Sequence, residues 1–457
     1  MLTETIAAIS TGGNSSGINI IRISGKNSKE IIDKIFTNND KLDHQKIIYG
    51  KIVNTSTKKI IDEVLVSYFK APNSFTGEDV CEINCHGGRK VTLDILNLVV
   101  ACGARLAEPG EFSKRAFLNG KMDLSKAEAI IDVINAKTSA QAKLAANQLA
   151  GGLYDRVELI RDKLVTLMAE IEVSIDYPEY DYEEIDNGKL NERLEEIKKE
   201  IEFLIKTYND GKYIKDGVNL AIVGNTNVGK SSLLNTLLNE EKAIVTDIEG
   251  TTRDVIEETL VIGNLVLNVS DTAGIRDTKD VVEAIGVSKS LKAIEDTDMI
   301  IYLIDITRGV DGKDIELLNK IKMLGKPYIV GLNKIDISRE KLDEIKQKLN
   351  VYNNVIAIST ATREGINTLK ETIETIFNIK EFDGEENRIV VNERHKQLLE
   401  KAMMHLNKAK ETTIIGESLD IAAIDVKEAT SLLGEITGKD ASSDVVNKIF
   451  EKFCLGK

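Results

Sequence analysis

The sequence predicts an α/β domain inserted into a helical domain, with an α+β domain at the N-terminus. Residues 1–120 mix strand and helix patterns, whereas residues 121–215 and 380–457 have the apolar spacing of helices. Residues 216–379 alternate apolar strands with helices, which predicts a mainly parallel sheet covered by helices on both faces. A chain of 457 residues is long enough for about three domains of ordinary size.

Composition and charge narrow the class of protein. The net charge is −14 and the pI is about 5.1. We therefore do not expect this chain alone to bind RNA over a broad surface, and we expect any tight RNA binding to come from a partner. Four cysteines in this length do not form a disulfide framework. No apolar run approaches the ~18–20 residues that cross a bilayer, and the first residues do not read as a signal peptide. We therefore expect a cytoplasmic protein that does not bind a membrane.

The first 130 residues contain patterns typical of individual strands and helices. Gly17–Ser24 and Glu63–Phe69 have the pattern of half-buried strands. Ser28–Phe36 has helical spacing, with its serine as the start signal. Farther along, Ser125 and Glu128 have the spacing of a capping box at the start of a helix.

In the inserted domain, the strands are short apolar runs separated by helical patterns. The predicted strands are Val218–Gly224, Leu265–Asp271, Met299–Asp305, Pro327–Lys334 and Asn354–Ser359. In such a domain, ligands bind at the carboxyl ends of the strands, so the segments that follow these strands are the candidate binding loops.

A phosphate-binding motif follows the first of these strands. Gly224–Ser231 reads Gly-Asn-Thr-Asn-Val-Gly-Lys-Ser, which fits G-x-x-x-x-G-K-[ST] between a strand and a helix. The glycines let backbone N–H groups point at phosphates, and the helix N-terminus favours an anion. Lys230 is expected to reach the β and γ phosphates, and the Ser231 hydroxyl to bind Mg2+. The alternative is an ordinary glycine-rich turn, which the flanking strand and helix make less favourable.

Further motifs follow in order along the domain. They are Gly250–Asp254, Asp271–Gly274, Asn333–Asp336 and Ser359–Ala361. We expect Thr252 to complete the Mg2+ shell and Asp271 to lie near the metal. The Asp336 carboxylate can accept two hydrogen bonds from the guanine ring N–H and amine, a pair that adenine does not offer. Together the motifs predict a GTP-specific P-loop GTPase.

The sequence leaves a gap in the hydrolytic mechanism. Ile275 follows Asp271–Gly274 where Ras-like enzymes carry the glutamine that orients the attacking water. An isoleucine side chain cannot orient water. Asp277, Asp280 and Glu283 are nearby carboxylates, and the residues themselves do not choose among them.

Several longer segments carry a resemblance to a known family. They are Arg22–Gly25, Asn73–Val80, His86–Gly88, Pro109–Phe112, Arg115–Lys121, Asp123–Leu124, Ile244–Ile248 and the final Phe453–Lys457. Through these the chain resembles, over its whole length, the MnmE (TrmE) family of bacterial tRNA-modification GTPases. The family ends in Cys-Ile-Gly-Lys, and this chain has Leu455 in place of the isoleucine.

The resemblance implies a division into domains. An N-terminal domain, 1–120, is expected to dimerise and to bind a tetrahydrofolate that donates a one-carbon unit, in its 5-formyl or 5,10-methylene form. A helical domain is built from 121–215 and 380–457 around the GTPase domain, 216–379. The folate positions implied are Arg22, Glu82, Lys121 and Lys457. Cations suit the glutamate tail of folate, and a carboxylate can accept from pterin N–H groups.

The resemblance also fills the mechanistic gap. It implies a K+ ion that supplies positive charge, held by Asn227, Thr246, Thr251 and the backbone of Ile248, with Glu283 orienting water and Lys230 as the second catalytic group. Mg2+ is expected at Ser231 and Thr252. The full set expected to bind GTP is Asn227, Val228, Gly229, Lys230, Ser231, Ser232, Thr246, Asp247, Ile248, Glu249, Gly250, Thr251, Thr252, Asp271, Thr272, Ala273, Gly274, Asn333, Lys334, Ile335, Asp336, Ser359, Thr360 and Ala361.

The family resemblance further implies a partner and a reaction. The chain is expected to form a homodimer and, with the flavoprotein MnmG, which carries FAD, a heterotetramer. Together they would add a carboxymethylaminomethyl or aminomethyl group to the wobble uridine of certain tRNAs. GTP hydrolysis would drive conformational change, and tRNA would be held mainly through the partner.

The cysteines are expected to be structural. Cys81 and Cys85 stand four apart on a strand, about 13 Å along it, too far to share one metal ion directly. Cys454 matches the tail cysteine of the family; placing Lys457 is the favoured role, and a nucleophilic role is the alternative.

Two other functions stay open at this level. One is an Era-type ribosome-assembly GTPase, which expects a Gly-x-x-Gly RNA-binding module with basic surroundings; residues 380–457 show helices and no such loop. The other is a GTP-gated scaffold with no catalytic partner, which predicts no folate binding.

Overall fold

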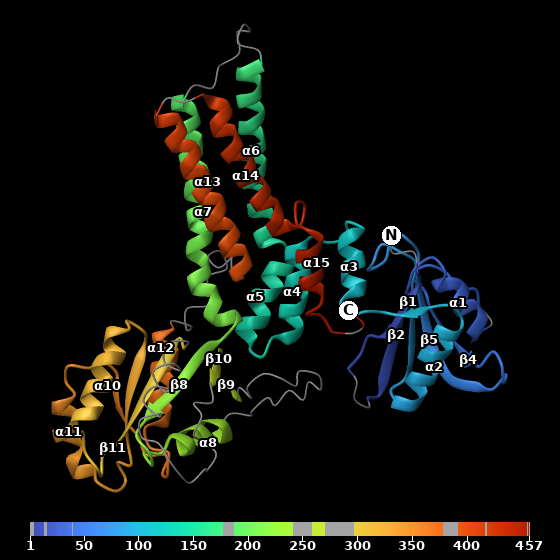
Figure 1. Cartoon of the computed structure of the whole chain (residues 1–457). Helices are drawn as coiled ribbons and strands as arrows, with labels where there is room; N and C mark the ends of the chain where they lie inside the picture. Colours follow the sequence, from blue (N-terminus) through green and yellow to red (C-terminus); the bar gives the residue numbers. More distant parts are fainter. Residues whose placement is uncertain are drawn as a thin grey trace. The chain divides into compact units, whose positions relative to one another are not determined.

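The computed structural model describes residues 4–12, 16–38, 40–176, 187–240, 258–269, 297–377, 392–415, 418–454 and 456. The chain divides into two compact units (Figure 1). The first unit is Met1–Ile131, Gln148–Ile201 and Gln397–Lys457; the second is Asp132–Asn147 and Glu202–Lys396. Among the described residues, no helix combines the length and the apolar character that crossing a membrane requires.

A seven-stranded sheet forms the N-terminal part of the first unit. Its strands are β1 (Ile6–Ile9), β2 (Ile18–Ser24), β3 (Phe36–Thr37), β4 (Ile47–Val53), β5 (Ile60–Phe69), β6 (Val80–His86) and β7 (Arg105–Leu106), in the order β3-β4-β5-β6-β2-β1-β7. Helices α1 (Ser28–Ile35) and α2 (Arg89–Ala101) pack their apolar side chains on it. Both strands predicted here are present, as β2 and β5.

Helix α1 begins at Ser28, but the serine does not cap it. The N-cap residue is Asn27, and the buried Ser28 hydroxyl instead donates to the carbonyl oxygens of Gly25 and Asp79, at 2.6 and 2.8 Å. The helix start predicted at Ser28 is therefore confirmed.

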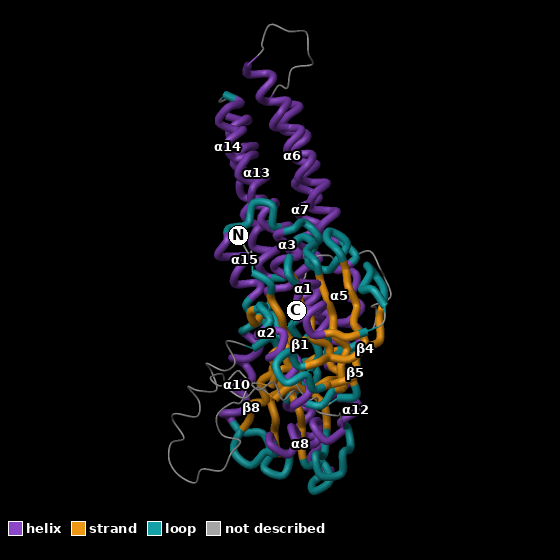
Figure 2. The backbone as a smooth tube through the Cα atoms, turned by 90° about the vertical axis from the view of Figure 1, so that its right-hand side faces the viewer, coloured by secondary structure: helices purple, strands orange, loops and turns teal. Residues whose placement is uncertain are grey.

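Helices of 8 to 29 residues make up the rest of the described part of the first unit. They are α3 (Glu111–Leu118), α4 (Leu124–Asn135), α5 (Ser139–Leu149), α6 (Gly152–Asp176), α7 (Asn187–Lys215), α13 (Glu393–Ile415), α14 (Leu419–Thr437) and α15 (Ser443–Phe450), of which α4, α5, α7 and α13 extend into the second unit. Helices α6, α7, α13 and α14 run side by side (Figures 1 and 2). The segments before and after the α/β domain therefore share one bundle, as the predicted insertion requires.

The capping box predicted at Ser125 and Glu128 is wrong. Helix α4 begins at Leu124, which places Ser125 inside its first turn, and the carboxylate of Asp123 accepts the N–H of Lys126 at 2.9 Å. The Ser125 hydroxyl also donates to Asp123. Aspartate is as good a cap as serine, and an aspartate two residues earlier in the sequence outcompetes it.

The second unit contains a six-stranded sheet of order β13-β12-β11-β8-β10-β9. Its strands are β8 (Val218–Gly224), β9 (Glu258–Ile262), β10 (Leu265–Val269), β11 (Met299–Asp305), β12 (Tyr328–Asn333) and β13 (Val355–Ala357). All neighbours are parallel except β9 and β10. The predicted mainly parallel sheet is therefore confirmed, and β9, an antiparallel edge strand, was not predicted.

Helices cover both faces of this sheet, which confirms the α/β prediction. Apolar side chains of α8 (Lys230–Glu240) and α12 (Ile366–Ile376) pack in one core cluster. Those of α10 (Gly312–Met323) and α11 (Leu342–Lys348), which follows the short 3-10 turn η1 (Arg339–Lys341), pack in the other. The carboxyl ends of β8, β11, β12 and β13 consequently lie along one edge, where the predicted nucleotide motifs begin.

Candidate functional site

The loop Gly224–Ser231 joins β8 to α8 and has an unusual backbone. Gly224, Asn227 and Gly229 have φ angles of +155°, +62° and +102°. A Cβ atom on Gly229 would lie 2.3 Å from Nδ2 of Asn333, so only glycine allows this close approach. The loop therefore has the shape in which successive N–H groups can turn toward a bound anion.

Lys230 is held against this loop. Its Nζ donates to the carbonyl oxygens of Gly224 and Asn225, at 2.8 and 2.7 Å. Burial lowers the pKa of Lys230 from its usual value, because the charged amine is partly removed from water. Ser231 and Ser232 follow in the first turn of α8, where the helix dipole favours negative charge.

The motif at the end of β12 packs directly on the phosphate loop. Asn333, fully buried, donates from Nδ2 to the carbonyl of Val228 at 2.8 Å and accepts the N–H of Thr360 at 3.1 Å. Next to it, the Ser359 hydroxyl donates to Oδ1 of Asp336 at 2.6 Å. Ile335, which is buried, and Ala361, which is exposed, complete these two segments. The structure thus brings together the motifs Gly224–Ser231, Asn333–Asp336 and Ser359–Ala361.

Lys334 forms a second bridge to the phosphate loop. Its φ of +67° is uncommon for a residue with a side chain. Its Nζ donates to the carbonyl of Asn227 at 2.9 Å and to the carboxylate of Asp305 at 2.6 Å. Burial alone would raise the pKa of Asp305, but hydrogen bonds from Lys334 and Thr307 lower it. No sequence motif marks Asp305, because nothing in its pattern sets it apart from other acids at strand ends.

The remaining predicted positions of the nucleotide site lie outside the described residues. They are Thr246, Asp247, Ile248, Glu249, Gly250, Thr251, Thr252, Asp271, Thr272, Ala273, Gly274 and Glu283, together with Ile275, Asp277 and Asp280. The described half of the site thus comprises the phosphate loop and the segments expected to bind the base.

In the N-terminal sheet, two of the predicted folate positions form an ion pair. Arg22 on β2 and Glu82 on β6 face each other in register, and Arg22 Nε lies 2.9 Å from Glu82 Oε1. The guanidinium lies 5.2 Å from the ring centre of Phe75 and 5.7 Å from that of Phe112, within the range of cation–π attraction. Both charged groups are only partly exposed.

Lys121 lies beside the loop between β5 and β6, and the chain end lies beside β1. A Cβ atom on Gly77 would lie 3.2 Å from Cγ of Lys121. The aliphatic part of the Lys121 side chain therefore packs against the loop that also carries Phe75, two residues before Gly77. The Ser10 hydroxyl donates to the carbonyl of Gly456 at 2.9 Å, and Gly456, at φ +88°, packs against the Ile9 carbonyl. The first and last parts of the chain therefore touch, and Lys457 itself lies outside the described residues.

The four cysteines lie in different surroundings. Cys81 and Cys85 are buried on β6, and burial raises the pKa of both thiols. Cys102 is partly buried at the end of α2. Cys454 is exposed, and its carbonyl accepts the N–H of Gly110 at 3.5 Å.

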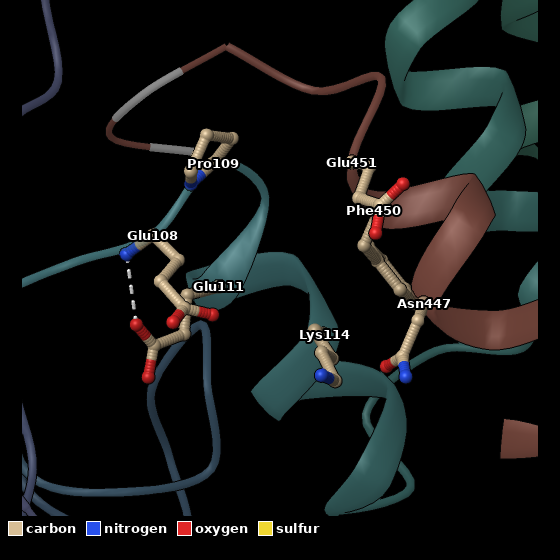
Figure 3. A pocket seen from close by; sticks show the side chains of 7 residues that line it. All are labelled: Glu108, Pro109, Glu111, Lys114, Asn447, Phe450 and Glu451. Carbon is tan, nitrogen blue, oxygen red and sulfur yellow. Dashed lines mark hydrogen bonds between the residues drawn. The ribbon is translucent and has the colours of Figure 1, made fainter. Parts of the chain in front are cut away.

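A cavity of about 210 Å³ lies between α3 and α15 (Figure 3). It is lined by Glu108, Pro109, Glu111, Lys114, Asn447, Phe450 and Glu451, none of which was a predicted site residue. Both oxygens of Glu111 are already used, by Arg105, by Arg115 and by the Glu108 N–H. Burial would raise the pKa of Glu111, but these partners hold it at about 2. Glu111 is thus part of a structural ion-pair cluster.

Comparison with known proteins covers nearly the whole chain. The family model of the MnmE helical domain matches residues 124–454, and the model of the GTP-binding protein TrmE N-terminus matches residues 5–121. The tRNA modification GTPase MnmE of Acetivibrio thermocellus is 46% identical over 459 residues, covering 99% of each chain. That of Carboxydothermus hydrogenoformans is 44% identical and covers 100% of both chains.

A solved structure of Aquifex aeolicus Era is 32% identical and covers 41% of this chain and 67% of its own, with a TM-score of 0.27. The identity to the two MnmE relatives extends over 99% and 100% of the chain. The chain therefore belongs to the MnmE (TrmE) family of tRNA modification GTPases.

Proposed function

We propose that the chain hydrolyses GTP at the loop Gly224–Ser231, with guanine selected by Asp336. The observation that carries this proposal is the junction of three motifs, in which Asn333 ties Val228 to Thr360 while Ser359 orients the Asp336 carboxylate. In this arrangement Lys230 would bind the β and γ phosphates, and the proposed GTP contacts are those named from the sequence. The Ser231 hydroxyl, a hard oxygen donor in the first turn of α8, fits Mg2+, which would neutralise phosphate charge.

The proposed biological reaction is the modification of the wobble uridine of certain tRNAs. The chain would act as a homodimer with the FAD-carrying flavoprotein MnmG, adding a carboxymethylaminomethyl or aminomethyl group. Support comes from the full-length identity to relatives named tRNA modification GTPase MnmE. The acidic net charge of −14 favours tRNA binding mainly through the partner.

Tetrahydrofolate is the proposed one-carbon donor, bound by Arg22, Glu82, Lys121 and Lys457. The donor set fits such a ligand, because cations suit its carboxylates and Glu82 can accept from pterin N–H groups. Gly456 on Ser10 brings the chain end to the sheet that carries Arg22 and Glu82. The matching domain division is 1–120 for folate binding and dimerisation, 121–215 with 380–457 for the helical domain, and 216–379 for the GTPase domain.

The described residues lack the RNA-binding module that the Era-type alternative predicts. It requires an RNA-binding module within residues 380–457, and the described part of that stretch consists of α13, α14, α15 and the short tail. The family model of the MnmE helical domain also extends through these helices to residue 454. The scaffold alternative predicts no folate binding, so a measured affinity for folate would contradict it.

GTP hydrolysis should require K+. The proposed ligands are Asn227, Thr246, Thr251 and the backbone of Ile248, and Ile275 leaves no glutamine to orient water. Replacing KCl by NaCl at equal ionic strength should slow GTP turnover by about tenfold or more, because the smaller ion fits this loop poorly and charge stabilisation falls. ATP should not be hydrolysed in either salt. Equal rates in KCl and NaCl would remove K+ from the mechanism, and equal use of ATP and GTP would overturn the assigned site.

Removing Leu455–Lys457 should weaken folate binding and leave GTP turnover unchanged. Gly456 of the tail accepts a hydrogen bond from Ser10, the residue after β1, whereas the nucleotide site uses no residue of this segment. Calorimetry with 5-formyltetrahydrofolate should show at least about a tenfold loss of affinity, since a charged hydrogen-bond donor is removed. Lys452→Ala, a nearby exposed lysine, serves as the control and should bind folate normally. Unchanged affinity in the truncated chain would exclude the tail from the site.

A further inference from the structure

A buried carboxylate contacts the phosphate loop from the side of α10. Oδ1 of Asp314 accepts Nδ2–H of Asn225 at 2.9 Å and the hydroxyl of Tyr302 at 2.7 Å. Asp314 is 3% exposed and Tyr302 is 2% exposed. Asn225 is the second residue of the phosphate loop, and no role in the proposed site has been assigned to its side chain.

The other oxygen of Asp314 is also engaged. Oδ2 accepts the N–H of Asp311 at 3.0 Å, and Asp311 in turn caps α10 by accepting the N–H of Asp314 at 2.9 Å. Burial and the Asp314 carboxylate raise the pKa of Tyr302, so its hydroxyl stays a donor at neutral pH. Donors therefore fix the carboxylate in one orientation, with Oδ1 aimed at Asn225.

Holding Asn225 has a consequence for Lys230. The Asn225 carbonyl is one of the two acceptors of the Lys230 amine, at 2.7 Å. Asn225 stands between Gly224 and Asn227, both with positive φ, in a stretch of backbone that costs free energy to maintain. A buried hydrogen bond to the Asn225 side chain stabilises that backbone before any ligand binds, and such preorganisation reduces the entropy lost on binding.

We propose that Asp314 is a positioning residue for nucleotide binding. It anchors Asn225, and the Asn225 carbonyl in turn places the Lys230 amine for the phosphates. The inference rests on the proposed GTP site and deepens it, because it assigns the first turn of α10 a part in shaping the phosphate loop. Asp314 increases nucleotide affinity through its contact with Asn225, and not by stabilising α10.

A double-mutant cycle tests this route. Asn225→Ala removes the anchored group and leaves Asp314 bonded to Tyr302 and Asp311, so the fold should survive. Asp314→Ala removes the anchor. Each variant should bind GDP about tenfold more weakly in a fluorescence titration, which is the effect of losing a hydrogen bond to a charged group. The double variant should bind no more weakly than Asp314→Ala, because both changes remove the same interaction.

Asp311→Ala is the matched control. It removes the other half of the same capping box and leaves the contact between Asn225 and Asp314 in place. It should lower the thermal midpoint less than Asp314→Ala, which also leaves the buried Tyr302 hydroxyl without its acceptor, and GDP affinity should stay within twofold of the natural chain. Asn225→Gln, with an amide on a longer stem, should restore part of the affinity lost in Asn225→Ala.

The experiment distinguishes a failure of the positioning role of Asp314 from a failure of the proposed GTP site. Natural affinity in Asn225→Ala, additive losses in the double variant, or an equal loss of affinity in Asp311→Ala would each overturn the positioning role. Those results leave the GTP site intact, since the natural chain binds GDP in all of them. Failure of the natural chain to bind GDP or GTP would instead contradict the proposed function itself.

Discussion

Asp336→Asn is expected to weaken GTP binding by at least about 100-fold and to create affinity for xanthosine triphosphate. The carboxylate is proposed to accept two guanine hydrogen bonds, and losing two charge-assisted bonds costs about 3–6 kcal/mol. The orientation of the new amide follows from the structure. Ser359 donates to Oδ1 of Asp336, so the amide oxygen should take that position and the NH2 group should face the base. A donor there suits the extra oxygen of xanthine.

Equilibrium binding of both nucleotides to both chains measures this switch. Asp343→Asn, an exposed acid in the first turn of α11, is the matched control and should keep the natural preference for GTP. If Asp336→Asn bound GTP as tightly as the natural chain, the base would not lie against Asp336, and the assignment of Asn333–Asp336 would fail.

Glu283→Ala is expected to slow GTP hydrolysis about 100-fold or more while GTP binding stays within about twofold. The proposed role is to orient the attacking water in place of the glutamine that Ile275 replaces. A group of this kind contributes about 3 kcal/mol or more in the transition state and little to ground-state binding. Single-turnover hydrolysis and a separate binding titration distinguish the two effects.

The acids next to Glu283 supply the controls for this second prediction. Asp277→Ala and Asp280→Ala remove carboxylates from the same stretch and should hydrolyse GTP at nearly the natural rate. A slow Asp277 or Asp280 variant beside a normal Glu283 variant would move the role to that acid. A Glu283 variant that binds GTP poorly would point to a structural role.

The sequence predicted the α/β domain well because its signals are local. Buried parallel strands are continuous apolar runs, and Met299–Asp305 was predicted with the bounds that β11 has. Strand β9 was missed because its apolar run is only the three residues Leu260–Ile262. The cap of α4 was misassigned for another reason: both Asp123 and Ser125 are residue types that cap helices, and the sequence pattern does not choose between them.

Within the site, the residues of the nucleotide motifs were predictable from the sequence, whereas the residues that hold those motifs in place were not. The phosphate loop and Asn333–Asp336 have fixed spacings that follow from the shape of the nucleotide. Asp305 and Asp314 have no such spacing. Asp305 contacts Lys334, and Asp314 contacts Asn225 of the loop, only after β11 and α10 have packed in the folded domain. The pairing of Arg22 with Glu82 depends on the register of β2 and β6, 60 residues apart, and only the family resemblance suggested that the two act together.

Mass spectrometry of tRNA nucleosides tests the central claim most directly. The organism lacking this chain should lose the carboxymethylaminomethyl or aminomethyl group at the wobble uridine. The natural chain should restore that group, and a chain with Lys230→Ala should not, because Lys230 is proposed to bind the phosphates of GTP. Wobble uridines that keep their full modification without this chain would contradict a role in tRNA modification.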